Sequence, residues 1–197
     1  MSEPMPPRRT RIIEAATAVF LRYGFAKTTM VDIAEATGLT RPTLYQEFPD
    51  KESVFHAVVD LMVATKLAEI RAGLGRRKTL EAKLRFACDA WGSEGFDLVQ
   101  AHPDASDMFE LGFASVCRGY EGFGTLLEEV LREPVSRSRI TQPAHEVARV
   151  MVYAIKGFKD IAKDGEDIRR LIATQVAVVA AALASDQPAN AAPKGSK

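Results

Sequence analysis

The stretch of residues 28–48 constrains the fold of this chain most strongly, because it places two short helical patterns on either side of one glycine. Thr29 is an N-cap residue type, and Asp32 three residues later forms a variant of the capping box. The helix that begins there is expected to end at Gly38, since glycine adopts a helix-terminating conformation without strain. Thr40 is again an N-cap residue type, so the sequence predicts two short helices joined by a tight turn, which is a helix-turn-helix unit.

The second of these helices has an apolar side and a polar side. The apolar spacing predicts a small core between the two helices, formed by Ile33, Ala34, Leu39 and Leu44. The polar side offers hydroxyl, guanidinium, phenol and amide groups, which can hydrogen-bond phosphates or base edges, on Thr40, Arg41, Thr43, Tyr45 and Gln46. Tyr45 also fits a half-buried core position, and Glu47 fits a solvated one.

Residues 28–48, with residues 11–24 before them and the sequence PDKESVF after them, resemble the TetR family of repressors. The family pattern is a helix ending in glycine, then roughly T-x-x-x-I-A-x-x-A-G-[VL]-[ST]-x-x-[TS]-[LF]-Y-x-x-F, and then K-E-x-L. The chain matches this pattern at Thr29, Ile33, Ala34, Gly38, Leu39, Thr40, Thr43, Leu44, Tyr45, Phe48, Lys51 and Glu52. It departs from the usual pattern at Thr37, Pro42, Gln46 and Glu47.

The resemblance implies a DNA-binding domain of three helices, the third of which lies in the major groove of a double-stranded operator. The residues then expected to face base edges or nearby phosphates are Thr40, Arg41, Thr43 and Gln46. Those expected to contact phosphates are Thr29, Tyr45 and Lys51. Arg8 and Arg9 would add phosphate or minor-groove contacts as a mobile arm, or remain solvated charges.

Bulk charge does not indicate nucleic-acid binding, because 26 basic residues balance 26 acidic ones. Any such binding must come from a local patch. Between Arg8 and Lys51 there are seven basic residues against five acidic ones, an excess of two positive charges. The excess is small, and its sign is the one that DNA binding requires.

Helical periodicity dominates the chain and strand-type alternation is missing, so the sequence predicts an all-α fold of about nine helices. Besides the two short helices, helices are expected at residues 8–23, 50–70, 78–100, 104–117, 119–132, 143–162 and 165–185. The expected domains are a helix-turn-helix DNA-binding domain, 8–52, and a helical ligand-binding and dimerisation domain, 53–185. Residues 1–7 and 186–197 are expected to be disordered tails, because their composition cannot support a packed element.

Aromatic and other soft side chains are dense between residues 84 and 126. They would either fill a dry core or line an apolar cavity between helices, and the family resemblance favours the cavity. The residues chosen to line it are Met62, Trp91, Phe109, Phe113 and Tyr120. The expected ligand is an unknown small apolar molecule.

The last two expected helices each carry an apolar stripe, and the final one is apolar nearly all round from Val176 onward. Core burial alone would explain these stripes, and so would a four-helix bundle shared by two copies of the chain. The predicted contacts of such a homodimer are Val147, Met151, Phe158, Leu171, Gln175 and Val179. A two-fold dimer would bring two recognition helices to two operator half-sites.

The sequence therefore predicts a dimeric repressor that a small apolar ligand releases from its operator. The alternative is a constitutive DNA-binding regulator whose second domain only dimerises. No nucleophile elbow, metal-ligand spacing or phosphate loop is visible, so neither an enzyme nor a metal or other cofactor is expected. Cys88 and Cys117 are expected to be free thiols, and the longest apolar stretch, about nine residues, is too short to cross a membrane. We expect a cytoplasmic protein.

Overall fold

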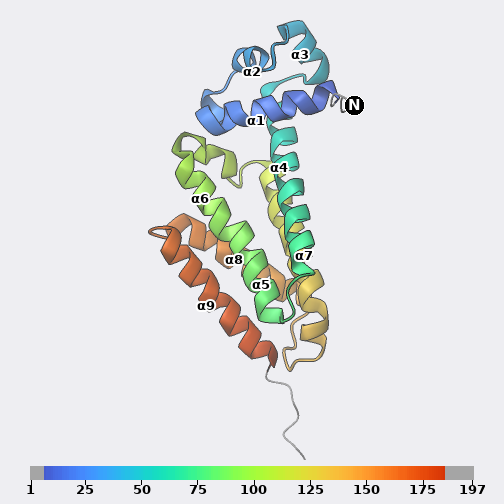
Figure 1. The fold of residues 1–197 in the computed structure, drawn as a ribbon, viewed down its shortest axis with the longest axis vertical. Coiled ribbons are helices and arrows are strands. Elements are labelled where there is room, and N and C mark those ends of the chain that lie inside the picture. The colour runs from blue at the N-terminus through green and yellow to red at the C-terminus, as the bar shows by residue number, and fades with distance from the viewer. Residues whose placement is uncertain (1–6, 185–197) are drawn as a thin grey trace, which may run out of the picture. The chain divides into compact units, whose positions relative to one another are not determined.

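The computed structural model describes residues 7–184, and all regular elements in this range are helical (Figure 1). The α-helices are α1 (Arg8–Lys27), α2 (Met30–Thr37), α3 (Arg41–Glu47), α4 (Lys51–Leu74), α5 (Leu80–Cys88), α6 (Glu94–Ala101), α7 (Ala114–Ser136), α8 (Ala144–Ile161) and α9 (Gly165–Ala184). A π-helical turn, η1, covers Asp89–Ser93, and a 3-10 segment, η2, covers Pro103–Phe109. The all-α prediction is confirmed over these residues. Apart from Pro7, the expected tails, 1–7 and 186–197, lie outside the described residues.

The described residues form two compact units. The first unit contains residues 7–68 and 95–122, and the second contains residues 69–94 and 123–184. Helices α1, α2 and α3 therefore share a unit with most of α4, with nearly all of α6, with η2 and with the first turns of α7. The domain boundaries expected from the sequence stay predictions.

The core of the first unit joins its first four helices. Each of them contributes a large side chain that is fully buried: Ile12, Ile33, Leu44 and Phe55. Burial of one such side chain stabilises the folded state by about 1.5–3 kcal/mol. The helix-turn-helix core predicted from the sequence is confirmed for Ile33, Ala34 and Leu44, whereas Leu39 is only partly buried.

The end of α1 differs from the expected one. The helix was expected to end at Tyr23, and it continues to Lys27 across a break at Gly24. Gly24 has φ 76° and ψ 173°, a conformation that essentially only glycine adopts. The glycine therefore breaks the regular helix where the sequence predicts its end, and a further short helical stretch follows as far as Lys27.

Two expected helices, 104–117 and 119–132, were placed wrongly. The structure has the 3-10 segment η2 first and then a single helix, α7, which passes through Gly119 and Pro134 without a break. Gly119 is buried and does not adopt positive φ, so it lies within the helix and does not end it. The expected helix 78–100 is likewise divided, because the π-helical turn η1 separates α5 from α6.

The second unit packs α5 and η1 against α8 and α9. Gly92 of η1 lies so close to α8 and α9 that a Cβ atom there would lie 2.6 Å from Ile172 Cδ1 and 3.0 Å from Ile155 Cγ2. Cys88 is a free thiol in this core, and burial raises its pKa to about 12. It is therefore a neutral packing residue at physiological pH.

Candidate nucleic-acid interface

The start of α2 is fixed by a complete capping box. The Asp32 carboxylate accepts a hydrogen bond from the Thr29 backbone N–H at 2.8 Å, and the Thr29 hydroxyl oxygen accepts one from the Asp32 N–H at 3.3 Å. The hydrogen bonds from Thr29 hold the pKa of Asp32 below its ordinary value. The turn after α2 is formed by Gly38, with φ 67° and ψ 19°, as the sequence predicts.

Helix α3 presents its polar residues to solvent. Thr40 caps it and lies 2.9 Å from Thr43, oxygen to oxygen. Arg41 and Gln46 are exposed, and Tyr45 is 49% exposed. All five polar residues singled out on this helix thus lie at accessible positions within one short element, while Leu44 is fully buried beneath them. Their contacts with DNA stay predictions.

Arg41 has a free guanidinium group. Within residues 7–184 it takes part in no hydrogen bond, ion pair or ring contact. An arginine near the start of a helix, with no internal partner, is available for the bidentate hydrogen bonds by which arginine binds guanine or phosphate.

Lys51 is engaged inside the first unit. Its ammonium donates a hydrogen bond to the Phe25 carbonyl at 2.7 Å and lies 4.3 Å from the centre of the Phe25 ring. The residue therefore ties the start of α4 to the end of α1. The predicted phosphate contact of Lys51 stays a prediction.

Arg8 and Arg9 form the first turn of α1 and pack against the end of α3. The Arg9 guanidinium donates a hydrogen bond to the Glu47 carbonyl at 2.7 Å and lies 3.9 Å above the Phe48 ring. Arg8 pairs with the Glu47 carboxylate at 3.8 Å. The carboxylate that departs from the family pattern thus has a basic partner, and Arg9 caps the C-terminal end of α3.

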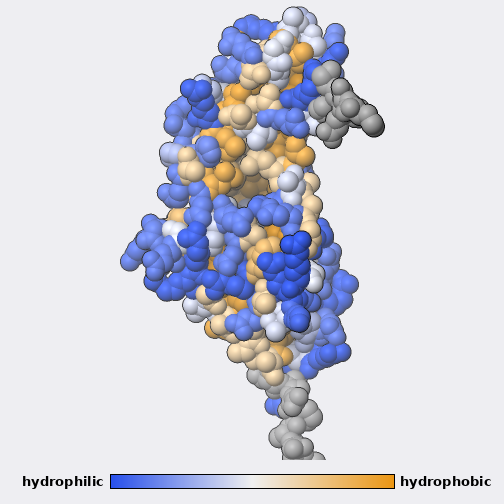
Figure 2. Space-filling view, viewed as in Figure 1, coloured by the Kyte–Doolittle hydropathy of each residue, from blue (hydrophilic) through white to orange (hydrophobic). Residues whose placement is uncertain are grey.

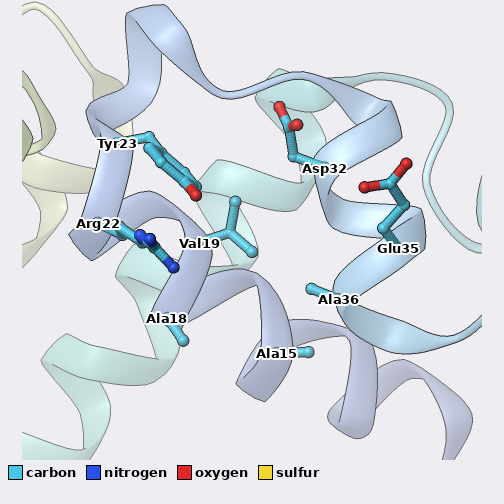
Figure 3. A pocket seen from close by; sticks show the side chains of 8 residues that line it. All are labelled: Ala15, Ala18, Val19, Arg22, Tyr23, Asp32, Glu35 and Ala36. Carbon is cyan, nitrogen blue, oxygen red and sulfur yellow. The ribbon is translucent and has the colours of Figure 1, made fainter.

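A surface pocket of about 380 Å³ lies between α1 and α2 in the same unit (Figure 3). Its floor consists of small residues such as Ala15, Ala18 and Ala36, and Figure 3 shows Arg22 on α1 opposite Glu35 on α2. None of the residues predicted to contact DNA lines this pocket. It is therefore separate from the polar side of α3.

Four of the five residues predicted to line a ligand cavity come together in the first unit. Met62, Phe109, Phe113 and Tyr120 are partly buried and pack against its core. The Phe113 ring lies 4.5 Å from the Phe55 ring, centre to centre, and 4.8 Å from the Phe25 ring. Phe25 and Phe55 are members of this cluster that the sequence analysis did not select.

The fifth residue, Trp91, belongs to the second unit. Its ring stacks on Phe123 with 4.8 Å between centres and 7° between planes. Lys159 lies nearby, with its ammonium 5.8 Å from the Trp91 ring centre, and burial lowers the pKa of Lys159 to about 8. The two groups of predicted ligand residues thus lie in different units, and ligand binding by either stays a prediction.

Three polar side chains, those of His56, Ser115 and Glu52, form a chain of contacts next to the aromatic cluster of the first unit. His56 Nδ1 lies 2.9 Å from the Ser115 hydroxyl oxygen, and His56 Nε2 lies 3.4 Å from the Glu52 carboxylate. Ser115 is fully buried, so its hydroxyl group is closed to a substrate. The contact between His56 and Ser115 connects α4 to the start of α7.

The residues predicted to form a dimer interface fall into two groups, one that serves the interior of the second unit and one that is partly exposed. Met151 is fully buried, and Gln175 donates a hydrogen bond to the Met151 carbonyl at 3.2 Å, so both side chains serve the interior of the second unit. The others keep part of their surface exposed: Val147, Phe158, Leu171 and Val179. Their contacts with a second copy stay predictions.

The most exposed apolar residues of α8 and α9 are not among the six predicted dimer contacts. They are Val150, Tyr153, Ile161 and Val178, each more than 60% exposed. Figure 2 shows apolar surface over the last turns of α9. Leu171, Val178 and Ala182 recur at spacings of seven and four residues, which places them on one side of the helix.

Residues 12–58 match a protein family described as "Bacterial regulatory proteins, tetR family". The HTH-type transcriptional repressor ComR of Escherichia coli K12 is 36% identical over 77 residues, which are 39% of this chain and 37% of ComR. The HTH-type transcriptional activator FasR of Mycolicibacterium smegmatis is 30% identical over 97 residues, which are 49% of this chain and 42% of FasR. The chain thus matches less than half the length of either relative.

A solved structure with a similar fold is the transcriptional regulator FadR from Bacillus subtilis in complex with stearoyl-CoA. It is 15% identical, with a TM-score of 0.63 over 88% of this chain and 98% of that one. The likeness shows that the two chains share a fold. Among the helices within residues 7–184, none has the length and apolar character needed to cross a bilayer.

Proposed function

We propose that the chain, whose residues 12–58 match the tetR family of bacterial regulatory proteins, is a dimeric transcriptional repressor that a small apolar ligand releases from its operator. The observation that carries the proposal is the exposed polar side of α3, with the free guanidinium of Arg41 at its start. Helix α3 is capped by Thr40 at its start, and the Phe48 N–H donates a hydrogen bond to the Leu44 carbonyl at its end. A recognition helix fixed in this way would enter the major groove of the operator.

Dimerisation is supported by the exposed apolar residues of α8 and α9. Exposed large apolar side chains that gather on one face of a protein are typical of interaction sites. Two copies of α3 related by a two-fold axis would bind two half-sites, and the second contact would strengthen the first by raising the local concentration of the domain.

Repression and release by a ligand are the finer part of the proposal. ComR is named a repressor and FasR an activator, so relatives act in both directions. The aromatic cluster around Phe113 and the stearoyl-CoA complex of FadR support an apolar ligand. A ligand acts only through its different affinity for the DNA-bound and the free conformation.

The test is selection of bound sequences from random duplex DNA by the full chain, followed by titration of the selected operator with a panel of apolar ligands. Enrichment of a palindromic sequence and its release by a ligand would support the whole proposal. Enrichment without release by any ligand would leave a constitutive regulator. Failure to enrich any sequence would contradict the proposed function.

Arg41→Ala is expected to weaken binding to the selected operator by about 1–3 kcal/mol, because a bidentate contact with a base is lost. Affinities for the operator and for an unrelated duplex should be measured by fluorescence anisotropy. Arg22→Ala is the matched control, since Arg22 is exposed on α1 and, within residues 7–184, its guanidinium has no ion pair and lies over the Tyr23 ring. Equal losses on both duplexes would show that Arg41 binds phosphate and reads no base.

Arg9→Ala is expected to weaken operator binding by about 1–2 kcal/mol, because α3 loses a hydrogen bond and a stacked cation at its C-terminal end. Arg9→Lys keeps the charge and should not restore affinity, because an ammonium lacks the planar shape that stacks on Phe48. The salt dependence of binding should match that of the wild type. A salt slope reduced by about one, with rescue by lysine, would instead identify a direct phosphate contact.

A further inference from the structure

We propose that Asp107 is a positioning residue for the DNA-binding helices, and that segment η2 sets the placement of α2 and α3 through it. The proposal rests on the proposed function, since it concerns how the DNA-binding surface is held. Asp107 lies outside α1, α2 and α3, and no role in DNA contact is assigned to it.

The Asp107 carboxylate holds two consecutive backbone amides at the end of α1. Oδ1 accepts a hydrogen bond from the Phe25 N–H at 2.9 Å, and Oδ2 accepts one from the Ala26 N–H at 2.8 Å. The partners are more than 80 residues apart in the chain. Hydrogen bonds to an ionised acceptor are roughly twice as strong as neutral ones. Both carboxylate oxygens are used, so the contact fixes the orientation of the segment as well as its distance.

Gly24 makes this approach possible. A Cβ atom at this position would lie 2.7 Å from Asp107 Oδ1 and inside van der Waals contact with the Asp104 carbonyl oxygen. The backbone of η2 thus packs directly on the backbone of α1. A contact between two backbones leaves no flexible side chain to absorb a displacement of η2.

The same short segment has two further hydrogen bonds, one from α4 and one within the segment itself. Lys51 of α4 donates a hydrogen bond to the Phe25 carbonyl, and the buried hydroxyl of Thr28 donates one to the Gly24 carbonyl at 2.6 Å. The next residue is Thr29, the N-cap of α2. Displacement of residues 24–28 therefore moves the start of the helix-turn-helix unit.

The two hydrogen bonds from Phe25 and Ala26 to Asp107 form a clamp between α1 and η2. The position of Asp107 in the chain connects this clamp to the aromatic cluster. Phe109 is two residues after Asp107 and Phe113 is six residues after it, and both pack against the core of the same unit. A ligand that displaced either ring would pull on η2. The clamp would transmit that displacement to α2, and this route exists in addition to the continuous helix α4.

A neighbouring ion pair provides the control. Lys27 lies 2.8 Å from the Asp104 carboxylate and lowers the pKa of Asp104 through a hydrogen bond and its charge, yet both side chains are exposed. Exposed pairs contribute little to stability. Asp104→Asn removes the same negative charge three residues away from Asp107 and leaves the clamp intact.

The test compares Asp107→Asn with Asp104→Asn in the full chain, on the selected operator and on an unrelated duplex. Asparagine keeps one acceptor oxygen and turns an NH₂ group toward the second amide, so one hydrogen bond is replaced by a repulsive contact. We expect Asp107→Asn to lose about tenfold in operator affinity relative to Asp104→Asn, with equal affinities for the unrelated duplex. Equal operator affinities of the two variants would overturn the proposal.

A measurement on the wild-type protein covers the case in which Asp107→Asn does not fold. The Phe25 and Ala26 amide protons should exchange with solvent at least about a hundredfold more slowly than in an unstructured peptide, because both are hydrogen-bonded. Exchange at the unstructured rate would overturn the clamp. Neither the exchange rates nor the folding of the variants depends on an operator, so failure of the proposed DNA binding would be recognised separately, by the lack of any selected sequence.

Discussion

Val178→Glu is expected to make the protein monomeric and to lower operator affinity by at least about a hundredfold, since two linked half-site contacts exceed one by that factor or more. Val178 is 64% exposed in a single copy, in the middle of the exposed apolar side of α9. An apolar side chain at that position gains stability when a partner covers it. A carboxylate there would have to be buried without a partner charge, which opposes association strongly.

Analytical ultracentrifugation over a range of protein concentrations measures the association directly. Leu111→Glu is the matched control, because Leu111 is an apolar residue of 50% exposure that lies outside α8 and α9. The control should associate and bind the operator as the wild type does. A Val178→Glu protein that remained dimeric would place the interface elsewhere, and a monomer with full operator affinity would contradict the proposed two-half-site mode of binding.

The helix-turn-helix unit was predictable because its signals are local. Thr29, Gly38 and Thr40 act on backbone groups within four residues of themselves, so their types and spacing are sufficient to place α2 and α3. The same reasoning was wrong at Gly119, where the glycine is buried inside α7. Sequence alone does not distinguish a glycine that ends a helix from one that lies buried within it.

The side chains of α8 and α9 illustrate a second limit. Periodicity identified an apolar stripe on each helix, but it did not show which edge of the stripe faces the interior. Met151 and Gln175 turned out to serve the interior of the second unit, while Val150 and Val178 are exposed. When an apolar stripe is wide enough to face both a core and a partner, nothing in the sequence marks which of its residues are buried in the core.

The long-range contacts that hold α2 and α3 in place had no signal in the sequence. Arg9 caps α3 from 38 residues away, and Asp107 reaches Phe25 across 82 residues. Such pairs depend on how helices pack, and a charged residue in a polar segment is compatible with many partners. Of the residues at the contact between α1 and η2, Gly24 was noticeable in the sequence, but its position indicated only the end of a helix.

Gly24→Ala is expected to lower the free energy of unfolding by about 3–5 kcal/mol, because two penalties add at this position. The first is conformational, since φ 76° with ψ 173° lies in a region that is essentially restricted to glycine. The second is steric, because the new methyl group would overlap the Asp104 carbonyl oxygen and press on the Asp107 carboxylate. Urea denaturation followed by circular dichroism gives the change directly.

Gly38→Ala separates the two penalties. Gly38 also has positive φ, at 67°, but apart from its own chain neighbours no atom of the described residues lies within 4 Å of the place where its Cβ would be. This variant should therefore show only the conformational penalty of a left-handed residue, about 1–2 kcal/mol. The excess loss in Gly24→Ala measures how tightly η2 packs on the end of α1. Equal losses in the two variants would show that η2 yields to a methyl group, and a segment that yields so readily could not transmit a ligand-induced displacement to α2.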